Sequence, residues 1–237
     1  MLIINKFTVA FSVFSVILAI LNSARNIGYT IVSFKAFAFV NLSVYSVFAM
    51  LGGMMLPFVY GMLFEGEPIT VWKFLSIIII TISLFITVDF KQKSKGIIYF
   101  LAVFVLNGFS GIISAFHQRS PFSAEYAVDS ASFTALSAIF SLIFCAALLL
   151  IRTKKIPAVN FKPFIFATGA GLLNTFANYI LLITIAGGVQ SSIQYTMVTG
   201  GTMVMSLIIS LIRKENITLK NLISTFLALV ATVIVIF

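Results

Sequence analysis

Long apolar stretches follow one another along almost the whole chain, separated only by short polar joints. A helix that crosses a bilayer needs about 20 consecutive, mainly apolar residues. With 61% hydrophobic and 9% charged residues, the chain carries too much apolar surface for a water-soluble fold to bury. The sequence therefore predicts an all-α, polytopic transmembrane helix bundle of about eight spans. These lie at about residues 7–33, 38–64, 70–88, 97–117, 129–151, 163–186, 189–212 and 218–236.

An internal repeat helps to count the spans, because residues 7–64 could form either two long helices or three short ones. Three short matches occur in the same order in both halves of the chain. LNSARN at residues 21–26 resembles LNTFAN at 173–178, while Gly52-Gly53 and the tetrapeptide at 67–70 match Gly200-Gly201 and the tetrapeptide at 215–218, both 148 positions later. Residues 163–212 have room for only two spans, so we expect two spans in residues 7–64 as well.

The repeat also predicts how the halves are oriented. Spans one to three correspond to spans six to eight, and because equivalent spans are five apart, each copy enters the membrane from the side opposite to its twin. Inverted repeats of this kind are typical of secondary transporters. We expect a first repeat at residues 1–90, which lacks two N-terminal spans present in the second, and a second repeat at residues 96–237.

Three consecutive spans resemble those of EamA-type transporters of the drug/metabolite transporter superfamily. They are an Asn-bearing span, a Gly-rich span that ends in Gly66-Glu67-Pro68-Ile69-Thr70, and the apolar span after it, and the pattern occurs twice. The resemblance covers nearly the whole chain. It implies ten helices arranged as five plus five, a central cavity, transport of small metabolites and a bacterial plasma membrane location. This chain lacks the first two helices of that pattern, which keeps open an inactive truncated chain or pseudo-transporter, or completion by a homodimer or partner chain.

The net charge of +9 lies almost entirely in the polar joints. Fourteen of the fifteen Lys and Arg residues are found there, without the interleaved aromatic residues of a nucleic-acid surface, so we expect no nucleic-acid partner. Eight spans place eleven of these residues on one side and Lys6, Lys73 and Arg119 on the other. The positive-inside rule then predicts that both termini are outside, whereas the family resemblance implies cytoplasmic termini.

Polar residues within the spans are the candidates for a solute site, because polar groups inside a membrane face a cavity or a neighbouring helix. Asn22 and Asn26 lie one helical turn apart, as do Asn174 and Asn178 in the second copy. Each pair could line a site or form hydrogen bonds between helices. Arg25 lies beside the first pair and could bind an anionic solute, pair with nearby polar groups or extend to the interface.

The seventh span is the most polar of the apolar stretches. Gln190, Gln194 and Tyr195 could bind a solute hydroxyl or amide, and Asn107 in the fourth span could face the same cavity. We expect alternating access around a midplane cavity lined by spans one, two, four, six and seven. The glycine pairs predict close helix packing or a bend.

Two polar residues at the ends of spans are assigned structural positions. His117, the single histidine, closes the fourth span, so we expect it at the membrane interface. Glu67 precedes Pro68, a residue suited to the first turn of a helix, and its carboxylate is expected to complement the dipole of the helix that follows.

The acidic residues all fall at span ends or in joints, so no embedded carboxylate could bind a cationic drug. We therefore expect a small neutral polar or anionic metabolite as the solute, with the lipid bilayer as the other partner. The rival class, a membrane-embedded enzyme, would need paired acids, a metal cluster or a nucleophile with its base. The sequence offers no such set, so we predict no catalytic residues, no metal and no cofactor.

Overall fold

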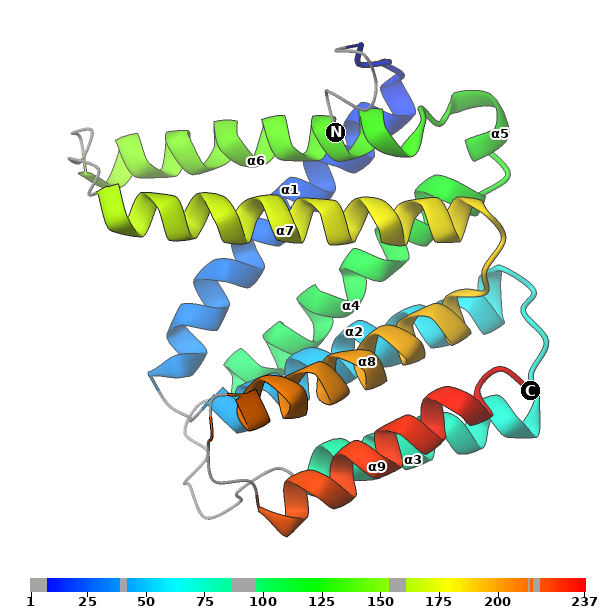
Figure 1. The fold of residues 1–237 in the computed structure, drawn as a ribbon. Helices are drawn as coiled ribbons and strands as arrows, with labels where there is room; N and C mark the ends of the chain where they lie inside the picture. Colours follow the sequence, from blue (N-terminus) through cyan, green and yellow to red (C-terminus); the bar gives the residue numbers. More distant parts are fainter. Residues whose placement is uncertain (1–7, 39–41, 87–96, 154–160, 213, 215–217) are drawn as a thin grey trace. The chain divides into compact units, whose positions relative to one another are not determined.

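The computed structural model describes residues 8–38, 42–86, 97–153, 161–212, 214 and 218–237. These residues form eight helices of 16 to 26 residues and one of four, with no strand among them (Figure 1). The all-α prediction is confirmed. The helices are α1 (Val13–Phe37), α2 (Leu42–Phe64), α3 (Val71–Ile86), α4 (Ile97–Arg119), α5 (Ser123–Tyr126), α6 (Ser130–Thr153), α7 (Phe161–Ala186), α8 (Ser191–Ile212) and α9 (Leu219–Ile234).

Six of these helices are long and apolar enough to cross a membrane, and α3 and α9 are shorter apolar helices of 16 residues. The chain is therefore an integral, multi-pass membrane protein. Among the described residues of the range 7–64 there are two helices, as the repeat predicted. The first begins at Val13, later than expected, because Ser12 accepts a hydrogen bond from the amide of Ser15 at 3.1 Å and so caps the helix.

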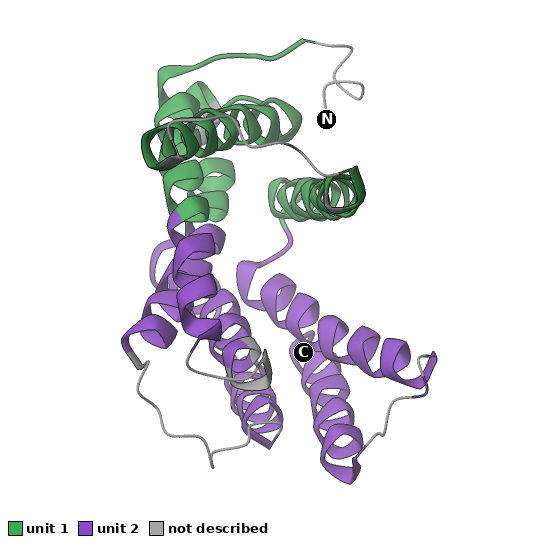
Figure 2. Ribbon diagram, turned by 90° about the vertical axis from the view of Figure 1, so that its left-hand side faces the viewer, with its two compact units in different colours: residues 1–27, 113–188 green, residues 28–112, 189–237 purple. Residues whose placement is uncertain are grey.

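The helices gather into two compact units (Figure 2). Unit 1 comprises residues 1–27 and 113–188, and unit 2 comprises residues 28–112 and 189–237. Helices α1 and α4 contribute to both units, α5 to α7 belong to unit 1, and α2, α3, α8 and α9 belong to unit 2. This division follows spatial proximity, whereas the repeats at 1–90 and 96–237 were defined by sequence similarity, so their boundaries stay a prediction.

Unit 2 is built from two pairs of helices that correspond in the repeat. Helix α2 packs on α8, and α3 packs on α9 (Figure 1). Two buried serines join the second pair: Ser76 donates to the carbonyl of Ala231 at 2.8 Å, and Ser83 donates to the carbonyl of Ser224 at 2.6 Å. Ser76 and Ser224 are 148 positions apart, as are Ser83 and Ala231. The two hydrogen bonds therefore join equivalent pairs of positions, although α3 supplies the donor in both.

Glycines allow the close helix contacts of unit 2. A Cβ atom on Gly52 would lie 2.0 Å from the carbonyl oxygen of Phe104 on α4. A Cβ atom on the equivalent Gly200 would lie 2.1 Å from Cγ2 of Thr232 on α9. The packing role predicted for these two glycines is confirmed, but the first copy packs on α4 and the second on α9.

Unit 1 has a separate apolar core. Leu18 and Ala19 of α1, Phe133 and Leu136 of α6, and Leu182 of α7 form its buried centre. Ser23 on α1 adds a hydrogen bond to the carbonyl of Ser137 on α6 at 2.8 Å. These contacts hold α1, α6 and α7 together within the unit.

Candidate functional site

A tight turn after α2 directs Glu67 towards the start of α8. Gly66 adopts a φ of 66°, which an L-residue rarely takes, and the amides of Glu65 and Glu67 both donate to the carbonyl of Gly61. A Cβ atom on Gly61 would lie 2.8 Å from the Glu67 carboxyl carbon. The glycines thus allow the acidic side chain to fold back against the end of α2.

The Glu67 carboxylate caps α8, the helix from the other half of the chain. It accepts hydrogen bonds from the amides of Ser191 and Ser192, the latter at 3.2 Å, and from the hydroxyl of Ser192. Free amides and a positive dipole end make a helix N-terminus a favourable place for a carboxylate. Glu67 therefore has the expected capping role, but for a different helix, since Thr70 accepts from the amide of Lys73 at the start of α3.

Lys73 completes this group of buried polar residues. Its Nζ atom lies 3.9 Å from Oε2 of Glu67, donates to the carbonyl of Pro68 at 3.1 Å, and donates to Oε1 of Gln190. We call Glu67, Lys73, Gln190, Ser191 and Ser192 the polar clasp. It joins the α2–α3 connection to the α7–α8 connection, at the end of unit 2 where α2 ends and α8 begins, which we call the closed end.

Four predicted site residues lie in unit 2. Gln190 belongs to the polar clasp, and Asn107 donates through Nδ2 to the carbonyl of Ala49 at 2.6 Å, so it links α4 to α2. Gln194 and Tyr195 are 7% and 8% exposed on the buried side of α8. They lie within the first turn and a half of α8, next to the clasp.

The first Asn pair belongs to unit 1 and has two different environments. Asn22 is half-buried, and its Nδ2 atom lies 3.4 Å from Oγ of Ser137 on α6. Arg25 donates to Oδ1 of Asn22 at 2.9 Å, which matches the pairing alternative. Asn26 lies on an exposed part of α1.

The second Asn pair lies on α7, also in unit 1. Asn174 and Asn178 are both exposed, and Nδ2 of Asn178 donates to the backbone carbonyl of Asn174 at 2.8 Å. The expectation that these residues line a site stays a prediction.

His117 lies in the core of unit 1, packed between helices. Its expected place at the level of the membrane interface stays a prediction. Its side chain is 0% exposed, Nε2 lies 2.9 Å from Oγ of Ser15, and the ring stacks on Phe133 with a centroid distance of 3.8 Å. Ser15 in turn accepts from the amide of Val128. The imidazole therefore links α4 to α1, a tertiary contact that its position at the end of a span could not reveal.

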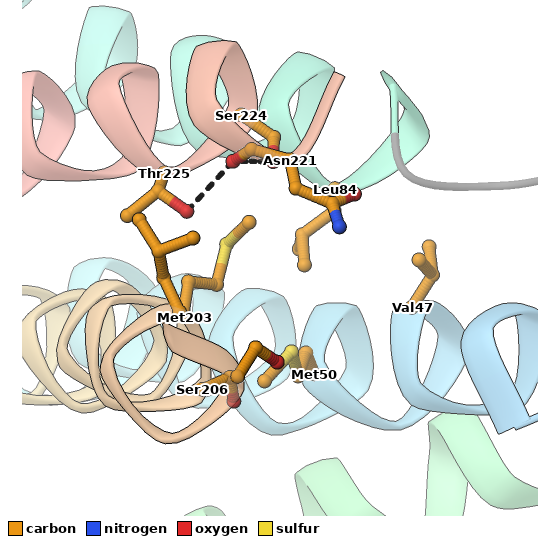
Figure 3. A pocket seen from close by; sticks show the side chains of 10 residues that line it. Val47, Met50, Leu84, Met203, Ser206, Asn221, Ser224 and Thr225 are labelled. Atoms are coloured by element: carbon orange, nitrogen blue, oxygen red, sulfur yellow. Dashed lines mark hydrogen bonds between the residues drawn. The ribbon is translucent and has the colours of Figure 1, made fainter. Parts of the chain in front are cut away.

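A cavity of about 160 Å³ lies at the other end of unit 2, where α2 begins and α8 ends (Figure 3). We call this the open end. The cavity lies between α2, α3, α8 and α9, so α3 and α9 contribute walls that the sequence did not predict, and none of the nine predicted site residues lines it. Its lining consists of Val47, Met50, Leu84, Met203, Ser206, Leu207, Ser210, Asn221, Ser224 and Thr225.

The sequence predicted two members of the polar clasp, Gln190 as a site residue and Glu67 as a capping residue, but neither their contacts with Lys73 nor the residues that line the cavity. For the clasp a signal was available, because Glu67 and Thr70 belong to the tetrapeptide that is repeated at 215–218. The second copy of that tetrapeptide lies mostly outside the described residues. For the cavity, small hydroxyl residues near the ends of apolar helices gave no distinctive pattern.

The chain was also compared with known proteins. No family model matches it, and no curated protein shows a significant similarity to it.

Proposed function

We propose that this chain is a secondary transporter of the EamA type that moves a small neutral polar or anionic metabolite across a bacterial plasma membrane by alternating access. The observation that carries the proposal is the contrast between the two ends of unit 2. One end is closed by the polar clasp, and the other contains a cavity.

The two ends occupy equivalent places in the repeat. The cavity residues Ser206, Asn221 and Ser224 correspond, 148 positions earlier, to Phe58, Lys73 and Ser76. The counterparts of the exposed Ser206 and Asn221 are buried at the closed end, with exposed fractions of 2% and 3%, whereas Ser224 and its counterpart Ser76 are both buried. An inverted repeat that is open at one end and closed at the other is the arrangement that alternating access requires.

The contacts between repeat copies support the same interpretation. The hydrogen bonds of Ser76 and Ser83 join equivalent positions of α3 and α9, and α2 packs on its counterpart α8. The polar groups of unit 2 hold helix ends together or line a cavity. Both uses suit the movement of a solute better than the making and breaking of covalent bonds.

A transport screen tests the proposal. The purified chain is reconstituted into lipid vesicles, and uptake of a mixture of polyols, amides and carboxylates is followed by mass spectrometry. We expect saturable uptake of at least one solute class, and counterflow when the vesicles are preloaded with that solute. Uptake no greater than that of protein-free vesicles for every solute would overturn the proposal.

Two variants then test the predicted site residues. If Gln194 or Asn178 contacts the solute, Gln194→Ala or Asn178→Ala lowers transport by about tenfold or more, because a polar group of the bound solute loses its partner. Thr202→Ala is the matched control, because Thr202 is an exposed residue of α8 that donates to the carbonyl of Val198. All three variants must insert into the membrane normally, so that a lower rate reflects transport and not the amount of protein.

A further inference from the structure

The polar wall of the cavity in unit 2 offers mainly hydrogen-bond acceptors. Ser206 donates to the carbonyl of Thr202 at 2.8 Å, and Thr225 and Ser224 donate to the carbonyl of Asn221 at 2.8 and 3.0 Å. A hydroxyl that donates its proton to the backbone keeps lone pairs that can accept from another molecule. The three hydroxyls therefore suit a ligand with O–H or N–H groups.

Asn221 adds an amide that can both donate and accept. It lies in the first turn of α9, and its amide nitrogen points into the space between α9 and the α2 and α8 helices (Figure 3). The residue is exposed, so a ligand can reach it. Asn221 is thus placed to bind a carbonyl or hydroxyl of a ligand held against the hydroxyl wall.

The opposite wall is apolar and adaptable. Val47 and Met50 of α2, Leu84 of α3 and Met203 of α8 supply it. Methionine side chains adjust readily to differently shaped partners. No charged side chain is among the described residues of the lining, so a full charge inside the cavity would lose hydration without gaining a counter-ion.

The size of the cavity limits the ligand. Its volume of about 160 Å³ is close to the roughly 150 Å³ of an engineered cavity that accommodates benzene. A molecule of roughly six to eight non-hydrogen atoms therefore fits.

The exposed Lys214 and Lys220 lie at this end of the unit. Both belong to the set of basic residues that the positive-inside rule assigns to the cytoplasmic side.

We infer that this cavity binds a small uncharged solute with hydroxyl or amide N–H groups and a short apolar part, and that the solute reaches it from the basic end of the unit. The inference rests on the proposed transport function and names the solute class and a site for it. Asn221 is the main specificity residue, Ser224 and Thr225 are the hydroxyl contacts, and Ser206 lines the wall beside them.

Protection of an introduced cysteine tests the site without any need for transport. The full chain carries Cys145→Ala, which removes its single cysteine, together with Ser206→Cys in the cavity. The membranes are treated with methyl methanethiosulfonate in the presence of butyramide, butane-1,4-diol, butyrate or pentylammonium, which are all of roughly six non-hydrogen atoms and fit the cavity. Thr202→Cys, on the exposed part of α8 one turn away, is the matched control.

We expect butyramide and butane-1,4-diol to slow labelling at Ser206→Cys, by about threefold when the probe is at twice its dissociation constant. The charged probes should have little effect, and no probe should protect Thr202→Cys. Adding Asn221→Ala should abolish the protection by butyramide, whereas Leu222→Ala, on an exposed neighbour outside the lining, should preserve it.

If none of the four probes slowed labelling relative to membranes without a probe, the inference would be overturned. Protection by all four probes that is insensitive to Asn221→Ala would also overturn it, because it would indicate an apolar crevice filled by lipid chains. A second reporter, Ser210→Cys, keeps the test decisive if the first variant does not insert normally.

The outcome can be separated from that of the transport screen. Protection without uptake by any solute would retain the binding site and reject the transporter. Uptake without protection would retain the transporter and place its solute elsewhere.

Discussion

The closed and open ends of unit 2 use equivalent positions of the repeat for opposite purposes. At the closed end, Phe58 and Lys73 fill the space beside α3, and Glu67 fixes the start of α8. At the open end, the counterparts of Phe58 and Lys73 are Ser206 and Asn221, which line a cavity. The comparison indicates that side-chain volume and one buried ion pair decide whether an end of the unit is filled or contains a cavity. The helices themselves are the same at both ends.

Exchanging the equivalent residues is expected to give the largest effect. Phe58→Ser should lower the free energy of unfolding by about 4 kcal/mol, because it leaves a void and a hydroxyl in the core of unit 2. Ser206→Phe should change it by less than about 1 kcal/mol, because the cavity accepts the added ring without displacing packed atoms. Unfolding in mixed micelles, followed by circular dichroism, measures both; similar losses would contradict the contrast between the ends.

Breaking the polar clasp should have the next largest effect. Glu67→Gln leaves the buried Lys73 without its carboxylate and should cost about 3 kcal/mol in the same unfolding experiment. Glu65→Gln is the control, because Glu65 is half-buried and accepts from the hydroxyl of Ser191, so about 1 kcal/mol is expected. A loss for Glu67→Gln no larger than that of the control would show that the clasp does not stabilise the closed end.

The serines between α3 and α9 should give the smallest effects. Ser76→Ala and Ser83→Ala each remove one hydrogen bond between membrane helices, which is worth about 0.6 kcal/mol on average. The two losses should be nearly equal, because both hydrogen bonds run from a buried serine of α3 to a carbonyl of α9 and join equivalent pairs of positions. Losses that differ by more than about 1 kcal/mol would contradict that equivalence between the ends of the helix pair.

Much of the fold could be predicted because the thickness of a bilayer sets the length of an apolar helix. Each of the eight predicted spans overlaps one of the eight helices of 16 to 26 residues, and the repeat correctly favoured two helices in the described part of residues 7–64. The least accurate boundary was the start of α1, where a capping serine and not the loss of apolar residues sets the first turn.

The site could be predicted only in part, because polarity does not reveal a partner. Gln190 and Asn107 were selected as polar residues in apolar spans, and both form contacts with other segments of the protein. Glu67 and Ser191 are 124 positions apart, so their contact could not be derived from local spacing. Asn221 and the serines of the cavity are small polar residues whose position between four helices appears only after folding.

By itself, the sequence determined that the chain is a multi-pass helical membrane protein and where most of its helices lie, because hydropathy and helix length are local properties that the bilayer constrains directly. Only the tertiary structure decided which end of unit 2 is closed and which contains the cavity. That outcome depends on side chains from α2, α3, α8 and α9, which are distant in the sequence and meet only when the helices pack.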